Sequence, residues 1–127
     1  MVTEKTQLGY LAENIASRYL EQNGYDILEK NYQKPWGEID IVAKKQTTVI
    51  FVEVKANRQG SLITAFNPEL RADHNKLHKI WRTAEIYMKN KFDSETEWQI
   101  DVISVIFDKE NQKAKIKHFK NIMTDLR

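Results

Sequence analysis

The sequence predicts an α/β fold built on a mixed sheet, and two observations carry this prediction. Apolar residues recur at helical spacing in two segments, and they alternate at strand spacing in the segments between and after them. The second helical segment also lies between two strand segments. Because a helix that connects two strands of one sheet allows them to run parallel, we expect a parallel pair at that point within a mixed sheet.

The predicted elements follow one another without a linker or a repeat. They are a helix over 8–20, a short strand over 25–31, strands over 38–43 and 48–56, a helix over 75–90, a strand over 98–107 and a further strand over 114–119. Gly24 is well placed to end the first helix. We expect 58–73 to be a loop, because it has little periodicity. A length of 127 residues suits one domain over 1–127.

Composition excludes several classes of protein. There is no cysteine, so disulfide frameworks and thiol nucleophiles are excluded. No apolar run approaches the roughly 18 residues of a membrane-spanning helix, and no signal-peptide core follows the N-terminus. We therefore expect a soluble, cytoplasmic protein with no membrane partner. A net charge of +2 permits a polyanionic partner such as nucleic acid without requiring one.

Charged side chains are predicted to face one another on two neighbouring strands. A hairpin whose connection is centred on Gln46–Thr47 places Asp40 across from Glu53. The same register places Glu38 across from Lys55. Directly opposed residues have Cβ atoms about 5 Å apart, and two carboxylates at that distance repel one another unless a cation or a proton lies between them. Gln46 and Thr47 make a poor two-residue turn, however, which favours a longer loop between the two strands.

The residue types at these positions are typical of phosphodiester hydrolysis. Mg²⁺ binds oxygen ligands and needs only one or two carboxylates besides water and a substrate phosphate. Lys55 is two residues from Glu53, so it projects to the same face and can reach a phosphate oxygen. The alternative is that these charges only solvate an exposed sheet face, with Lys44 or Lys45 neutralising the carboxylates. Against this alternative, Glu53 and Lys55 interrupt the most apolar strand of the chain.

Spaced motifs in the first half of the chain resemble the YraN-like family of uncharacterised bacterial proteins. They read Gly9-x-x-x-Glu13-x-x-Ala16-x-x-Tyr19-Leu20, Gly24-Tyr25-x-Ile27-Leu28-x-x-Asn31-Tyr32, Gly37-Glu38-Ile39-Asp40-Ile41-Val42-Ala43 and Phe51-Val52-Glu53-Val54-Lys55. That family is predicted to consist of endonucleases of the PD-(D/E)XK superfamily, distantly similar to archaeal Holliday-junction resolvases. The resemblance implies a restriction-endonuclease-like core, which runs helix, three strands, helix, strand.

The resemblance also implies a set of site residues. Asp40 and Glu53 correspond to metal ligands for Mg²⁺ or Mn²⁺, joined by the carbonyl of Val54, and Lys55 corresponds to the catalytic lysine. Glu13 matches a helix glutamate that similar resolvases direct toward the metal, although a surface glutamate is a serious alternative.

Further positions concern the surroundings of the metal and the substrate. Glu38 is part of the family signature, and we expect it behind the ligands, without direct contact to the metal. Lys76, Lys79 and Arg58 are expected to contact nucleic acid, with DNA favoured over RNA. A homodimer is expected only by analogy with resolvases, which cut paired strands.

The sequence departs from the family pattern at positions that handle substrate. Gln33 stands where a basic residue usually follows Asn-Tyr, and no arginine precedes Asp101 closely. For His118, which lies among lysines, a phosphate contact and no role at all both remain open. Two other functions therefore compete with nuclease activity. One is a nucleic-acid-binding module that keeps the fold without catalysis, and the other is a partner-binding protein with no nucleic-acid contact.

Overall fold

The computed structural model describes residues 6–58 and 74–122. Its elements are α1 (Gln7–Gln22), β1 (Asp26–Lys34), β2 (Gly37–Lys45), β3 (Thr48–Arg58), α4 (His74–Lys91), β4 (Trp98–Asp108) and β5 (Lys113–Phe119). One sheet has the order β1-β2-β3-β4-β5. The β3–β4 pair is parallel and the other pairs are antiparallel. The predicted α/β class and element order are confirmed. The loop predicted over 58–73 lies outside the described residues, except for Arg58, which ends β3.

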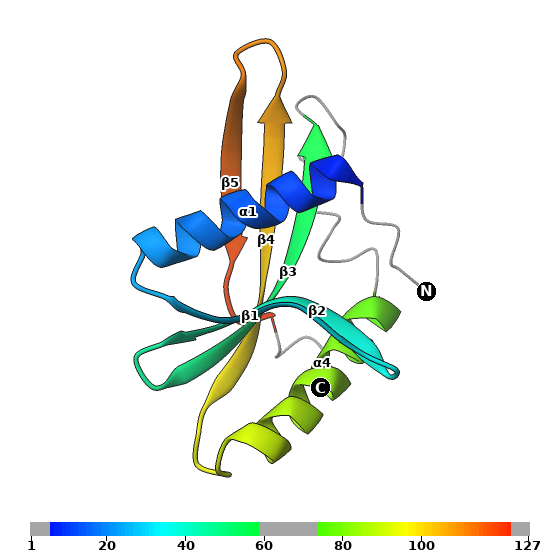
Figure 1. Cartoon of the computed structure of the whole chain (residues 1–127), viewed down its shortest axis with the longest axis vertical. Coiled ribbons are helices and arrows are strands. Elements are labelled where there is room, and N and C mark those ends of the chain that lie inside the picture. Colours follow the sequence, from blue (N-terminus) through cyan, green and yellow to red (C-terminus); the bar gives the residue numbers. More distant parts are fainter. Residues whose placement is uncertain (1–5, 59–73, 123–127) are drawn as a thin grey trace.

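The two helices cover opposite faces of the sheet. Figure 1 shows α1 in blue crossing β3, β4 and β5, and α4 in green beside β2. One apolar cluster joins α1 to the sheet and includes Ala12, Ala16, Leu20, Ile41, Ile50, Val52, Ile103 and Val105. The other joins α4 to the opposite face and includes Leu77, Ile80, Ala84, Val42, Phe51, Ile100 and Val102. In the described part of the chain, no helix is both long and apolar enough to cross a bilayer.

Local signals set the ends of α1. The hydroxyl of Thr6 accepts a hydrogen bond from the backbone N–H of Gly9 at 3.0 Å, as an N-cap residue does. Beyond the other end, Gly24 adopts a φ of 87°, a left-handed conformation that glycine reaches without steric cost. The predicted end of the helix at Gly24 is therefore confirmed.

The β2–β3 hairpin has the register that the sequence predicts, but it reaches this register through a tighter turn than expected. Lys45 pairs with Thr48, so only two residues connect the strands. Gln46 takes a φ of 54°, which a non-glycine residue adopts at some cost. The expectation of a longer loop is wrong, because the pairing of two long apolar strands outweighs an unfavourable turn residue.

The alternation predicted for β2 is wrong at one point. The sequence places Ile39 and Ile41 on one face, but Ile41 packs in the cluster under α1, and Ile39 packs in the cluster under α4. The recorded pairing with β3 ends at Ile41 and Val52, so β2 is released from that ladder just before Asp40. A strand that leaves its neighbour is free to twist, and simple alternation then no longer holds.

Candidate active site

The candidate site lies at the fork where β2 and β3 separate. The next residue on each strand beyond the last recorded pair is Asp40 on β2 and Glu53 on β3. The backbone N–H of Val54 donates a hydrogen bond to the side chain of Asp40 and not to a backbone carbonyl of β2. The nitrogen–oxygen distance is 2.8 Å. The carboxylate thus satisfies a polar group that the fork would otherwise leave unpaired, and it is anchored beside Glu53.

Asp40 and Glu53 form a carboxyl pair. Their side chains are in hydrogen-bonding contact, and the side chain of Glu53 is only 4% exposed. Burial, followed by the charge of Asp40 and the hydrogen bond to it, raises the pKa of Glu53 from 4.5 to about 7, and Lys76 acts in the opposite direction. The raised pKa means that the negative charge of this pair is unfavourable unless a proton or a cation neutralises it.

Two lysines approach the same oxygen of Glu53. Lys76 Nζ, from the first turn of α4, lies 2.7 Å from Glu53 Oε2, and Lys55 Nζ lies 3.6 Å from it. Burial alone would lower the pKa of Lys76, but the carboxylates of Glu53 and Asp40 outweigh it, so this pKa lies above 10.5. The structure therefore gathers two carboxylates and two ammonium groups, among them three of the residues expected to be catalytic.

Glu13 does not join this group closely enough to complete a three-carboxylate metal site. It is buried on α1, with 2% of its surface exposed, between residues that pack on the opposite face of the sheet from Glu53. Across residues 6–58 and 74–122, no three Asp, Glu or His side chains converge tightly enough to hold a metal ion. The ligands that the structure brings together are the pair Asp40 and Glu53.

This donor set fits Mg²⁺. Magnesium keeps several of its waters and is commonly bound through one or two carboxylates together with substrate phosphate. Asp40 and Glu53 supply two carboxylates in contact, one of them buried and with a raised pKa. A divalent cation would offset the burial and the charge of Asp40 that raise this pKa. Val54, whose backbone carbonyl was the third predicted ligand, lies between Glu53 and Lys55 on β3.

The remaining predicted residues lie on α4, β2 and β3, outside the group formed by the carboxyl pair and its two lysines. Lys79 is exposed one turn along α4 from Lys76, and Glu38 is exposed near the start of β2, where it pairs with Gln33 of β1. Arg58, exposed at the end of β3, lines a separate groove of about 790 Å³ that also includes Leu11, Phe107 and Lys113. Neither Asp40 nor Glu53 lines this groove, so it is not the candidate site.

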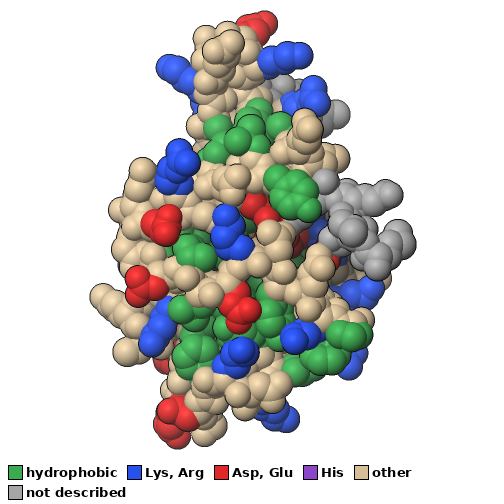
Figure 2. Space-filling model, in the orientation of Figure 1, with side chains coloured by type: hydrophobic (Ala, Val, Ile, Leu, Met, Phe, Trp, Pro, Cys, Tyr) green, Lys and Arg blue, Asp and Glu red, His purple; other side chains and the backbone are tan. Residues whose placement is uncertain are grey.

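On the face that carries α1, the described residues form no continuous basic surface. Figure 2 shows lysines and arginines interspersed there with acidic side chains and with apolar patches. Tyr10 and Leu11, on the outer side of α1, are 45% and 48% exposed. Glu53 and the lysine on α4 that pairs with it lie on the opposite face of the sheet.

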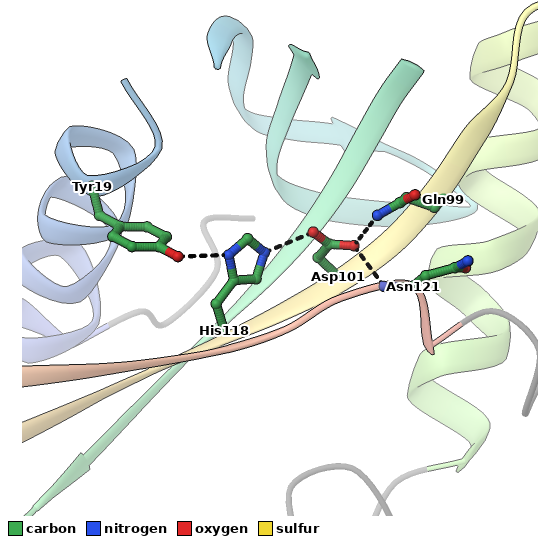
Figure 3. Close-up of polar contacts among 5 residues, drawn as sticks. All are labelled: Tyr19, Gln99, Asp101, His118 and Asn121. Carbon is green, nitrogen blue, oxygen red and sulfur yellow. Dashed lines mark hydrogen bonds and ion pairs between the residues drawn. The ribbon is translucent and has the colours of Figure 1, made fainter. Parts of the chain in front are cut away.

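Sequence reasoning missed a buried polar chain that links α1 to the sheet (Figure 3). His118 Nε2 lies 2.7 Å from Asp101 Oδ2, and His118 Nδ1 lies 2.8 Å from the hydroxyl of Tyr19. Gln99 Nε2 and the backbone N–H of Asn121 both donate to Asp101 Oδ1 at 2.9 Å. Asp101 is completely buried. An aspartate inside the apolar run of β4 was the signal, because a buried carboxylate requires partners.

Fold and site together define a small α/β protein with an acidic pair and two lysines at a fork in its sheet. Residues 12–105 match the family described as "Uncharacterised protein family UPF0102", and the chain belongs to this family. A UPF0102 protein of Fervidobacterium nodosum is 43% identical over 119 residues, which cover 91% of this chain and 80% of that protein. A UPF0102 protein of Campylobacter fetus is 37% identical over 114 residues, which cover 90% of this chain and 91% of that protein. The resemblance to the YraN-like family is thereby confirmed.

The solved structures that match this chain share little sequence with it. An XisH family protein from Nostoc punctiforme has a TM-score of 0.42 at 15% identity, covering 86% of this chain and 98% of that one. A fdxN element excision controlling factor protein from Anabaena variabilis has a TM-score of 0.44 at 14% identity, and the match covers 87% of this chain and 98% of that one.

Proposed function

We propose that this protein is a metal-dependent nuclease that hydrolyses phosphodiester bonds in nucleic acid, with DNA as the favoured substrate. The observation that carries the proposal is the contact between the carboxyl groups of Asp40 and Glu53 with Lys55 at the same oxygen of Glu53. Two adjacent carboxyl groups with a lysine are poorly explained as a solvated surface, because the side chain of Glu53 is 96% shielded from solvent. The family membership supports this function through the resemblance described above.

Each residue has a distinct task in this proposal. A bound Mg²⁺ or Mn²⁺ ion would lower the pKa of water and neutralise charge on the phosphate. Asp40 and Glu53 hold that ion, and the hydrogen bond from Val54 N–H fixes the orientation of Asp40. Lys55 orients the attacking water or stabilises the negative charge that develops on the phosphate oxygens. Hydrolysis then adds one water across the P–O bond, leaving a phosphate monoester at one end and a hydroxyl at the other.

Residues beyond the carboxyl pair would position the substrate. Lys76 and Lys79 lie at the start of α4, on the side of the sheet where Glu53 lies, and Arg58 lies at the end of β3. We assign the two lysines phosphate contacts near the carboxyl pair, which bind the backbone without reading its sequence. Arg58 lines the separate groove beside α1, so it would contact only a more distant part of the backbone. Glu13, buried on α1, would act on the ion only through intervening water, because it does not join the carboxyl pair closely.

A cleavage panel tests the proposal. Purified protein is incubated with single-stranded, duplex, flap and four-way-junction DNA and with RNA, in the presence of Mg²⁺, Mn²⁺ or chelator. Cleavage should require the metal and should be lost in Asp40→Ala and in Lys55→Ala. Glu21→Ala and Lys89→Ala change exposed residues of α1 and α4 by the same charges and should cleave normally. Activity that survives both site variants would contradict the proposal.

One observation favours a second function, a nucleic-acid-binding module without catalysis. The ion pair of Lys76 with Glu53 at 2.7 Å already neutralises part of the acidic charge that a metal would otherwise neutralise. Such a module would bind DNA through its lysines with an affinity that falls steeply with salt. Salt-sensitive binding without cleavage under any metal condition would favour this function over the nuclease.

A further inference from the structure

We propose that Lys76 is a displaceable internal counter-ion of the Asp40–Glu53 pair. Its ammonium group neutralises Glu53 while the site holds no metal, a divalent cation displaces it, and the released ammonium group then contacts a substrate phosphate. This inference rests on the proposed function in one respect, because it takes the carboxyl pair to be the metal site. It adds a residue on α4 that governs when this site accepts a cation.

The ion pair is built from one fixed partner and one adjustable partner. Glu53 lies within β3, and its side chain is 4% exposed, so packing holds it in place. Lys76 reaches the same oxygen from the first turn of α4, and its side chain is 47% exposed. Lysine has a flexible four-carbon stem that carries a single compact charge. If the contact breaks, Lys76 is therefore the partner that moves.

Lys76 and a metal ion compete for the same atom. The ammonium nitrogen lies 2.7 Å from Glu53 Oε2, which is the distance of a close ion pair. A magnesium ion would need an oxygen of this carboxylate at about 2.1 Å. Two cations on one oxygen would lie only a few ångströms apart in a site that water screens poorly, so they would repel one another strongly. Metal binding and the Lys76–Glu53 contact therefore exclude each other.

Lys55 does not compete in the same way. Its ammonium nitrogen is 3.6 Å from Glu53 Oε2, beyond direct hydrogen-bonding distance, and its side chain is 28% exposed. It is also fixed to β3 two residues from Glu53, so it remains beside the pair when a metal binds. Lys76, in contrast, is followed one turn later on α4 by the exposed Lys79. Its release places two ammonium groups near the path of an incoming phosphate.

Metal affinity, measured without substrate, tests this inference. Mn²⁺ binding to the full chain is followed by the electron paramagnetic resonance signal of the free ion. Lys76→Gln should bind Mn²⁺ roughly tenfold more tightly than the wild type, because the competing charge is gone. Lys76→Arg keeps the charge and should retain the wild-type affinity or bind more weakly. Lys89→Gln makes the same change at the other end of α4, about 20 Å away, and should leave the affinity unchanged.

Circular dichroism first establishes that each variant folds, and Lys76→Arg serves as the folded comparison if Lys76→Gln does not. An unchanged or weaker affinity in Lys76→Gln would overturn the inference, as would the absence of Mn²⁺ binding in every variant. Tighter binding in Lys76→Arg would overturn it as well. This outcome can be told apart from a failure of the proposed function. If the wild type cleaves nucleic acid but Lys76→Gln leaves the Mn²⁺ affinity unchanged, the nuclease function stands and the counter-ion role of Lys76 is wrong. If Lys76→Gln binds Mn²⁺ more tightly but no cleavage occurs, the counter-ion role stands and the nuclease function is wrong.

Discussion

The carboxylate of Asp40 accepts a hydrogen bond from the backbone N–H of Val54 at 2.8 Å, just beyond Ile41 and Val52, the last pair of the β2–β3 ladder. This single contact lets the two strands separate without leaving the N–H of Val54 unsatisfied. It also holds Asp40 beside Glu53, whose burial and proximity to Asp40 raise its pKa to about 7. The fork in the sheet is thus the feature that creates the carboxyl pair.

The raised pKa of Glu53 predicts an unusual dependence of stability on pH. Since the pKa is higher in the folded state than the value of 4.5 in the unfolded chain, the folded protein holds this proton more tightly. The stabilisation is fully present below pH 4.5 and is lost as the pH rises through about 7. Without metal, Glu53→Gln should therefore gain stability over the wild type by up to about 3 kcal/mol between pH 4.5 and 8. Urea unfolding of both proteins across this range measures the difference, and parallel curves would contradict the prediction.

Lys79 tests the nucleic-acid contact without touching the carboxyl pair. It is exposed on α4, one turn from Lys76. If Lys79 contacts a phosphate, Lys79→Gln should weaken binding to every DNA sequence to the same extent. The slope of log affinity against log salt concentration should fall in magnitude by about 1. Fluorescence anisotropy at several salt concentrations measures this slope, and Lys89→Gln is the matched control. An unchanged slope would remove Lys79 from the interface.

The buried chain around His118 should stabilise the fold. His118→Ala removes a partner of the completely buried Asp101 and should cost about 2–4 kcal/mol of unfolding free energy. Tyr19→Phe removes only the hydroxyl at the outer end of the chain and should cost about 1 kcal/mol. Lys115→Ala, an exposed change on the same strand as His118, should stay within about 0.5 kcal/mol of the wild type. Equal unfolding free energies of His118→Ala and Lys115→Ala in urea would show that the hydrogen bonds of His118 do not stabilise the fold.

Gly37 tests how closely β2 approaches α4. A Cβ added at Gly37 would collide with the hydroxyl of Thr83, which itself donates to the Lys79 carbonyl at 2.8 Å. Gly37→Ala should therefore destabilise the protein by about 1–3 kcal/mol. In the background of Thr83→Ala the colliding atom is gone, and the cost of Gly37→Ala should fall by about 1 kcal/mol or more. Thermal unfolding of the four proteins completes this cycle, and additive effects would argue against the close approach.

What the sequence could predict depends on how local the determinant is. The end of α1 is set by residues adjacent in the chain, and Gly24 just after the apolar pattern predicts it correctly. The faces of Ile39 and Ile41 were mispredicted, because alternation assumes a continuous ladder and β2 leaves β3 between them.

Longer-range contacts were less accessible to sequence reasoning. The opposition of Asp40 and Glu53 was accessible, because the hairpin register follows from the apolar strands that flank the turn. His118 and Asp101 meet only through the β4–β5 register, 17 residues apart. The ion pair of Lys76 with Glu53 depends on how α4 packs against the sheet, which no local pattern reveals. The sequence therefore predicted the acidic pair and Lys55 beside it, but not the direct ion pair of Lys76 with Glu53.

The most direct test of the metal site is an anomalous difference map from crystals of the wild-type protein soaked in Mn²⁺. We predict one strong peak roughly 2.2 Å from carboxylate oxygens of both Asp40 and Glu53, with the side chain of Lys76 turned away from Glu53. A map with no peak at this pair, and with Lys76 still in contact with Glu53, would contradict both the metal site and the nuclease mechanism that depends on it.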